Sequence, residues 1–208
     1  ENNFTFNLPT APKFVNFDYE NSWIRELTYE QPFDELLAQF QTTKDALARQ
    51  SAMFGLVRIA KDPKTSPDDK IKIRNALQTK LLGNEYWRVK SGILSQFVGL
   101  DSSDENTIST LLTIIKNEKA WLKSSAITFL GNTKDPKYAD VYLNALSDDS
   151  FRVIQTAAVA LGKTKDPRAF DALVKLADKP SMKSQTMLSS LAGLRELGDP
   201  RGFDVAYK

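Results

Sequence analysis

The side chains in this sequence that could do chemistry gather beside a repeated Asp-Pro dipeptide. A basic residue follows the proline of Asp135-Pro136, Asp166-Pro167 and Asp199-Pro200, and lysines also precede the first two dipeptides. The cations that would share one edge of the fold are Lys134, Lys137, Lys163, Lys165, Arg168 and Arg201. Such a ridge could bind phosphate groups or an acidic partner. We favour a solvated loop edge, because aspartates alternate with these cations and the net charge is only +2.

Most other site chemistry is excluded by composition. The chain contains no histidine and no cysteine, so His-based triads, cysteine nucleophiles and the usual zinc sites cannot form within it. Serine and threonine lie near lysine in "STLLTIIK" and "KSSAITFL", but no sign of a Ser–Lys pocket accompanies them. No calcium-loop spacing or phosphate-binding glycine motif is present. We therefore predict no catalytic, cofactor-binding or metal-binding residue in this chain.

Aromatic residues at the starts of predicted helices form a second candidate site. Tyr86, Trp87 and Trp121 could line a groove that contacts a partner. We favour core packing for them, because aromatic residues at helical spacing are usually buried. The arginines near the same helix starts are expected to bury their stems and pair with loop carboxylates; they are Arg49, Arg88 and Arg152.

A sequence repeat sets the elements that must position these residues. "LGNTKDPKYAD" at 130–140 returns as "LGKTKDPRAFD" at 161–171, 31 residues later, and the next Asp-Pro follows after 33. Aspartate can accept from free backbone N–H groups and proline fits the first helical position, so each dipeptide predicts a helix start. Apolar residues then recur at helical spacing. Gly131 and Gly162 are expected to end the preceding helices in the left-handed conformation.

These features predict a mostly α fold, a HEAT-like α-solenoid of about five helix pairs. The predicted pairs are 33–60 with 68–82, 84–100 with 104–116, 118–131 with 136–147, 149–162 with 167–178, and 181–197 with 200–208. The pattern resembles the short variant of HEAT-like repeats over about residues 45–208. Stacked pairs are needed because a single pair cannot bury its apolar stripe.

The amino-terminal part lacks this period. Alternation of Phe4, Phe6 and Leu8, and of Val15 and Phe17 further on, predicts short strands. We therefore divide the chain into a strand-rich segment at 1–29, read as the end of an upstream β-sandwich domain, and a solenoid at 30–208.

Three phrases near this boundary carry a more specific resemblance. They are "PKFVNFD" (12–18), "WIRELTYE" (23–30) and "ELLAQFQTTKDALARQSAMFGL" (35–56). Together they resemble the junction between the β-sandwich and the C-terminal helical domain in zinc aminopeptidases of the aminopeptidase N and leukotriene A4 hydrolase type. The family's His-Glu-x-x-His motif is absent, so no catalytic residue carries over and the chain alone is not expected to be an enzyme.

The resemblance implies a non-catalytic accessory domain that packs beside the catalytic domain of the same parent chain and limits substrate access. Zinc would then belong to that catalytic domain, and the peptide substrate would be affected only indirectly. The alternative is a free-standing HEAT-like scaffold that binds a protein or a small molecule. No nucleic-acid partner is expected at this charge balance, no membrane partner is expected without a span-length apolar run, and the sequence indicates no compartment.

Overall fold

The computed structural model describes residues 5–16 and 31–207, and the chain divides into two compact units, Glu1–Leu100 and Asp101–Lys208. The predicted α-solenoid class is confirmed: over the described residues the regular elements are all helices. The first unit contains α1 (Phe33–Thr42), α2 (Ala46–Lys61), α3 (Pro67–Leu82) and α4 (Trp87–Leu100). The second contains α5 (Glu105–Asn117), α6 (Ala120–Gly131), η2 (Pro136–Tyr138), α7 (Ala139–Ala145), α8 (Phe151–Thr164), α9 (Ala169–Ala177), η3 (Met182–Ser184), α10 (Gln185–Leu197) and α11 (Gly202–Ala206).

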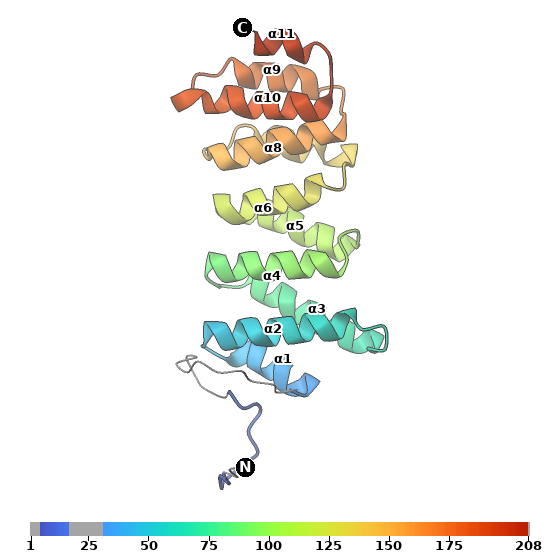
Figure 1. The fold of residues 1–208 in the computed structure, drawn as a ribbon, viewed down its shortest axis with the longest axis vertical. Coiled ribbons are helices and arrows are strands. Elements are labelled where there is room, and N and C mark those ends of the chain that lie inside the picture. The colour runs from blue at the N-terminus through green and yellow to red at the C-terminus, as the bar shows by residue number, and fades with distance from the viewer. Residues whose placement is uncertain (1–4, 17–30, 208) are drawn as a thin grey trace. The chain divides into compact units, whose positions relative to one another are not determined.

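In the first unit, α1 packs on α2, α3 packs on α4, and α2 contacts both α3 and α4 (Figure 1). Phe40, Leu77 and Phe97 are fully buried between these helices. The single helix predicted at 33–60 is in fact two helices. The break occurs because the Asp45 carboxylate accepts hydrogen bonds from the backbone N–H groups of Leu47 and Ala48, which starts a new helix.

In the second unit, α6, α8 and α10 lie side by side in one layer (Figure 1). The predicted pairing of 149–162 with 167–178 is wrong, because α9 packs more extensively on α10 than on α8. Small residues on α10 explain this preference. The Ser190 hydroxyl donates to the Leu173 carbonyl at 2.6 Å, and Gly193 leaves room for the Leu173 side chain. Likewise α5 packs on α6 and α7 on α8.

The repeated glycines act at helix contacts and do not adopt the left-handed conformation, which corrects the sequence prediction. Gly131 is the last residue of α6, and Gly162 lies within α8, two residues before its end. A β-carbon at Gly162 would lie 2.1 Å from the Gly193 carbonyl oxygen, so only glycine permits this approach of α8 and α10. After α6, α8 and α10, the left-handed residues are Lys134 (φ 56°), Lys165 (φ 57°) and Gly198 (φ 68°); Lys183 and Ser184, before α10, are left-handed too.

The Asp-Pro dipeptides at 62, 135, 166 and 199 start turns or a short 3-10 helix, and none of them directly starts an α-helix. Asp166 accepts from the N–H of Arg168, and α9 begins only at Ala169. By contrast Asp104, which is followed by Glu105 and not by proline, caps α5 by accepting from the N–H of Thr107 at 3.1 Å. Asp62-Pro63 follows α2 without starting a helix, since α3 begins at Pro67 with Ser66 as its cap. An aspartate that bonds the N–H two residues on forms a local turn in place of an N-cap.

Residues 5–16 form no strand, contrary to the prediction. Phe6, Leu8 and Val15 are more than half exposed, and no described segment offers a partner strand to pair with them. The Asn16 amide donates to the Asp45 carboxylate at 3.2 Å. The rest of the predicted strand segment, 17–29, lies outside the described residues, as does Phe4.

Candidate functional site

Two adjacent aromatic residues stand at the start of α4 in the first unit. Tyr86 is 62% exposed and Trp87 is 36% exposed, with their ring centroids 5.6 Å apart. The Arg88 guanidinium lies 5.4 Å from the centre of the Trp87 ring. Core packing, the role we favoured from sequence, does not hold for this pair. Both side chains lie at the end of the helix, where neighbouring helices cover only part of them.

A similar arrangement occurs at the starts of α6 and α8 in the second unit. Trp121 is 44% exposed, and the Arg152 guanidinium lies 3.9 Å from the centre of its ring. Phe151, the first residue of α8, is also exposed. We call Trp121, Phe151 and Arg152 the Trp121 surface. Core packing fails here too, and the sequence carried a signal for the stack: Arg152 follows Trp121 by one 31-residue period.

An ion pair beside the Trp121 surface ties α6 to the loop before α8. The Lys123 ammonium lies 2.9 Å from the Asp148 carboxylate. Partial burial disfavours the charged form of Asp148, but hydrogen bonds from the Lys123 side chain and the Ser150 backbone outweigh it. The pKa of Asp148 therefore lies below its ordinary value. The contact holds the two helix starts together, which keeps the tryptophan and the arginine in register.

A charge network joins three elements of the first unit. Arg49 on α2 contacts the Glu85 carboxylate at 2.6 Å and donates to the Thr43 carbonyl at 2.5 Å. Lys80, near the end of α3, lies 3.6 Å from the other Glu85 oxygen. The predicted pairing of Arg49 with a loop carboxylate is confirmed, whereas Arg88 and Arg152 stack on tryptophans. Glu85 directly precedes Tyr86, so this network fixes the loop that presents the aromatic pair.

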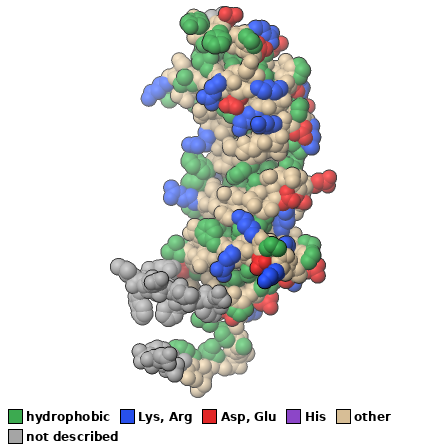
Figure 2. Space-filling view, turned by 45° about the vertical axis from the view of Figure 1, so that its right-hand side comes forward, with side chains coloured by type: hydrophobic (Ala, Val, Ile, Leu, Met, Phe, Trp, Pro, Cys, Tyr) green, Lys and Arg blue, Asp and Glu red, His purple; other side chains and the backbone are tan. Residues whose placement is uncertain are grey.

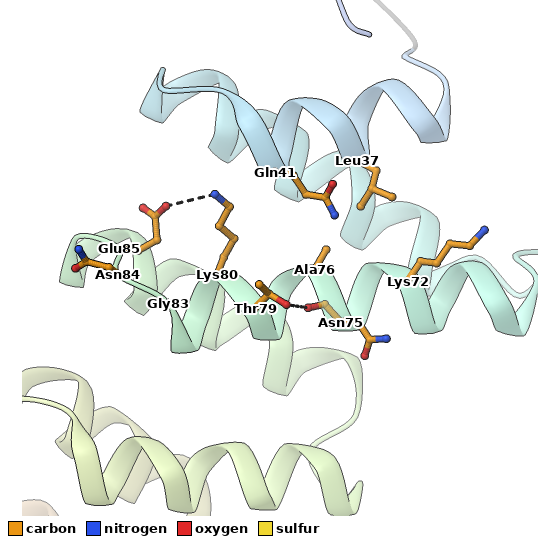
Figure 3. Close-up of a pocket in the computed structure, with 10 residues that line it drawn as sticks. All are labelled: Leu37, Gln41, Lys72, Asn75, Ala76, Thr79, Lys80, Gly83, Asn84 and Glu85. Carbon is orange, nitrogen blue, oxygen red and sulfur yellow. Dashed lines mark hydrogen bonds and ion pairs between the residues drawn. The ribbon is translucent and has the colours of Figure 1, made fainter.

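A groove of about 640 Å³ lies between α1 and α3 (Figure 3). Gln41 and Leu37 point into it from α1, while Lys80 and Glu85 close one end. Sequence reasoning missed this groove because it treated α1 and α2 as one helix.

The cations of the Asp-Pro loops are largely occupied within the fold. Arg168 contacts Asp140 at 2.6 Å and Asp166 at 2.9 Å, and the Lys163 ammonium donates to the Asn132 side chain at 3.0 Å. Lys165 donates to the carbonyls of Glu196 and Leu197, which close α10. The Lys134 backbone N–H donates to the Gly131 carbonyl at 3.2 Å, while its exposed ammonium forms no hydrogen bond or ion pair with the described residues.

The loop aspartates show the same neutralisation. Hydrogen bonds from the side chain of the basic residue two positions on lower the pKa of Asp135, Asp166 and Asp199 below their ordinary values. Figure 2 shows lysine and arginine side chains interspersed with aspartate and glutamate on the face drawn. These observations favour the solvated-edge interpretation over a phosphate-binding ridge.

Across residues 5–16 and 31–207, no group of three or more acidic side chains could hold a metal ion, and the chain has no histidine or cysteine to add. In the same residues, no helix has the length and apolar character that crossing a membrane requires.

Comparison with known families identifies the repeat. Residues 108–192 match the family model for HEAT repeats. The matched HEAT region lies within the second unit and contains the Trp121 surface and two of the Asp-Pro loops. A search of curated proteins returned no match for the chain.

Proposed function

We propose that this chain is a non-catalytic helical scaffold that binds a protein partner. The observation that carries the proposal is the exposed Trp121 ring with Arg152 stacked on it at 3.9 Å, inside the HEAT region. Tryptophan, tyrosine and arginine are enriched among the residues that dominate protein-binding energy. The same pairing at Trp87 and Arg88 gives the first unit a comparable surface.

The stacked arginine makes these tryptophans suitable for binding a protein partner, in addition to any contribution to the stability of the fold. A ring that is 44% exposed still has apolar area to bury, and a guanidinium held against it loses little freedom when a partner arrives. Two residues that are already oriented reduce the entropic cost of forming an interface.

The test compares tagged wild-type chain with Trp121→Ala in extracts of the source organism, using quantitative mass spectrometry of co-purified proteins. A specific partner should be recovered with the wild type and depleted at least about tenfold with Trp121→Ala, as expected for a hot-spot residue. Phe203→Ala is the matched control, because Phe203 is exposed at 73% and lies on α11, outside the Trp121 surface. Equal recovery by all three chains would contradict the proposal.

The finer proposal is that the partner is the catalytic domain of a zinc aminopeptidase within the same parent chain. The "ALARQSA" segment supports it, because Ala48 and Ala52 are buried in α2 while Arg49 between them holds Glu85. In the resembling family this helix lies next to the junction with the β-sandwich domain. On this proposal, the helical domain narrows the entrance to the active site, favours short peptides and leaves zinc binding to the catalytic domain.

Two observations test the finer proposal. The reading frame that encodes residue 1 should extend upstream and carry a His-Glu-x-x-His motif. In that parent enzyme, deletion of residues 33–208 should raise turnover of a long peptide relative to a dipeptide-like substrate. If the shortened enzyme stays folded and its length preference is unchanged, the gating role is wrong and the solenoid is better explained as a partner-binding scaffold.

A further inference from the structure

A small pocket opens between α2 and α4 of the first unit, next to the aromatic pair. Its volume is about 280 Å³, and its floor is made by the buried side chains of Phe40, Met53 and Ile93. Gly92 forms part of its wall, and a β-carbon added there would meet nothing within 4 Å. The pocket is smaller than the roughly 300–1,000 Å³ of small-molecule sites, so it suits a single side chain.

Two guanidinium groups line the same pocket. Arg49 uses its terminal nitrogens for Glu85 and Thr43, while its Nε is buried and has no hydrogen-bond partner in the described part of the chain. Arg88 stacks on Trp87, and no carboxylate among the described residues pairs with it. Glu85 therefore pairs with Arg49, whereas Arg88 forms no ion pair with a carboxylate of the described residues. An apolar floor beside the unpaired charge of Arg88 is complementary to an apolar group next to a carboxylate.

We propose that this pocket receives an apolar side chain of a protein partner that is followed directly by an acidic residue. The apolar side chain lies over Met53 and Ile93, and the carboxylate pairs with Arg88. This extends the proposed protein-binding function, and rests on it, by naming the local chemistry of the partner. The site is separate from the Trp121 surface, which belongs to the other unit.

The probe is the dipeptide N-acetyl-Leu-Glu-amide, with N-acetyl-Leu-Gln-amide as its uncharged match, titrated into the full chain and followed by NMR. The Leu-Glu dipeptide should give saturable shifts at Ile93 and Met53 with a dissociation constant of about 1–10 mM, as expected for so small a ligand. The Leu-Gln dipeptide should bind at least about threefold more weakly, because it lacks the charge that Arg88 attracts.

Two variants on α4 distinguish an effect of filling the pocket from a general effect of substituting a glycine of this helix. Gly92→Leu fills the pocket with a better helix former and should abolish the shifts while the protein stays folded. Gly99→Leu places the same side chain at another open position on α4 and should leave binding unchanged. Arg88→Gln should remove the preference for Leu-Glu over Leu-Gln.

The absence of saturable shifts, equal binding of the two dipeptides, or full binding by Gly92→Leu would each overturn the pocket assignment. If Trp121-dependent partner recovery persisted in that case, the pocket assignment alone would fall and the scaffold function would stand. If dipeptide binding were intact but partner recovery did not depend on Trp121, the Trp121 surface would fall as a protein-binding site and the pocket assignment would stand.

Discussion

The Arg152 guanidinium lies 3.9 Å from the centre of the Trp121 ring, and the two residues occupy equivalent positions in successive repeats. The contact links α6 to α8 while leaving the ring 44% exposed. It therefore joins two roles: it couples neighbouring helices, and it orients an apolar surface toward solvent.

A double-mutant cycle should measure the first of these roles. Trp121→Ala and Arg152→Ala, made singly and together, should show a coupling free energy of about 0.5–1 kcal/mol, as is usual for exposed cation–π pairs. Urea unfolding followed by circular dichroism gives the stabilities. Strict additivity of the two changes would mean that the stack contributes nothing to the fold.

Glycine positions should respond to alanine in opposite directions. Gly162→Ala should destabilise the second unit by about 1–3 kcal/mol, because its β-carbon would lie 2.1 Å from the Gly193 carbonyl oxygen. Gly99→Ala should stabilise the first unit by about 0.5–1 kcal/mol, since nothing lies within 4 Å and glycine is a poor helix former. Similar changes in the free energy of unfolding for both variants would refute the close approach of α8 and α10.

Asp166 should contribute stability that depends on pH. Hydrogen bonding from the Arg168 side chain lowers the pKa of Asp166 in the folded protein. A depressed folded pKa means that the contribution is present above the unfolded value, about 3.9, and is lost as pH falls through the folded value. Asp166→Ala should therefore cost about 1 kcal/mol near neutral pH through loss of the turn hydrogen bonds.

The check is to measure unfolding of wild type and Asp166→Ala by urea at neutral pH and again in acid. The difference between them should shrink in acid, where the wild-type carboxyl is protonated. A difference that stays constant with pH would show that the carboxylate charge has no part in it.

Tyr142 should tolerate loss of its hydroxyl. The side chain is fully buried, burial raises its pKa, and its hydroxyl has no hydrogen-bond partner among the described residues. Removing an unpaired buried polar group relieves its desolvation cost, so Tyr142→Phe should be neutral or stabilising by up to about 1 kcal/mol. A thermal melting temperature well below that of wild type would indicate that the hydroxyl has a partner after all.

The period of the sequence was sufficient to predict the solenoid, because apolar spacing and repeated turns act locally. Helix pairing was not predicted correctly, since it depends on where small residues such as Ser190 and Gly193 allow close contact. The left-handed conformation predicted for Gly162 was wrong for the same reason, because glycine is needed there to let two helices approach closely and not to form a left-handed turn.

The sequence predicted which residues belong to the candidate site, but it did not predict their exposure or their contacts. Trp87 and Trp121 were singled out, but their exposure depends on how far neighbouring helices extend past each helix start, which no local pattern records. The pairing of Arg49 with Glu85 spans 36 residues and could be predicted only as a class of contact. The pocket beside Gly92 arises from the distance between α2 and α4, which could not be predicted from the sequence pattern.

Hydroxyl-radical footprinting of Trp121 tests the central claim most directly. The isolated chain is compared with the same residues in the protein purified under mild conditions from its natural source. If the Trp121 surface binds a protein, oxidation of Trp121 should be several-fold slower in the native preparation than in the isolated chain. Equal oxidation rates in the two preparations would contradict the proposal that this surface is a protein-binding site.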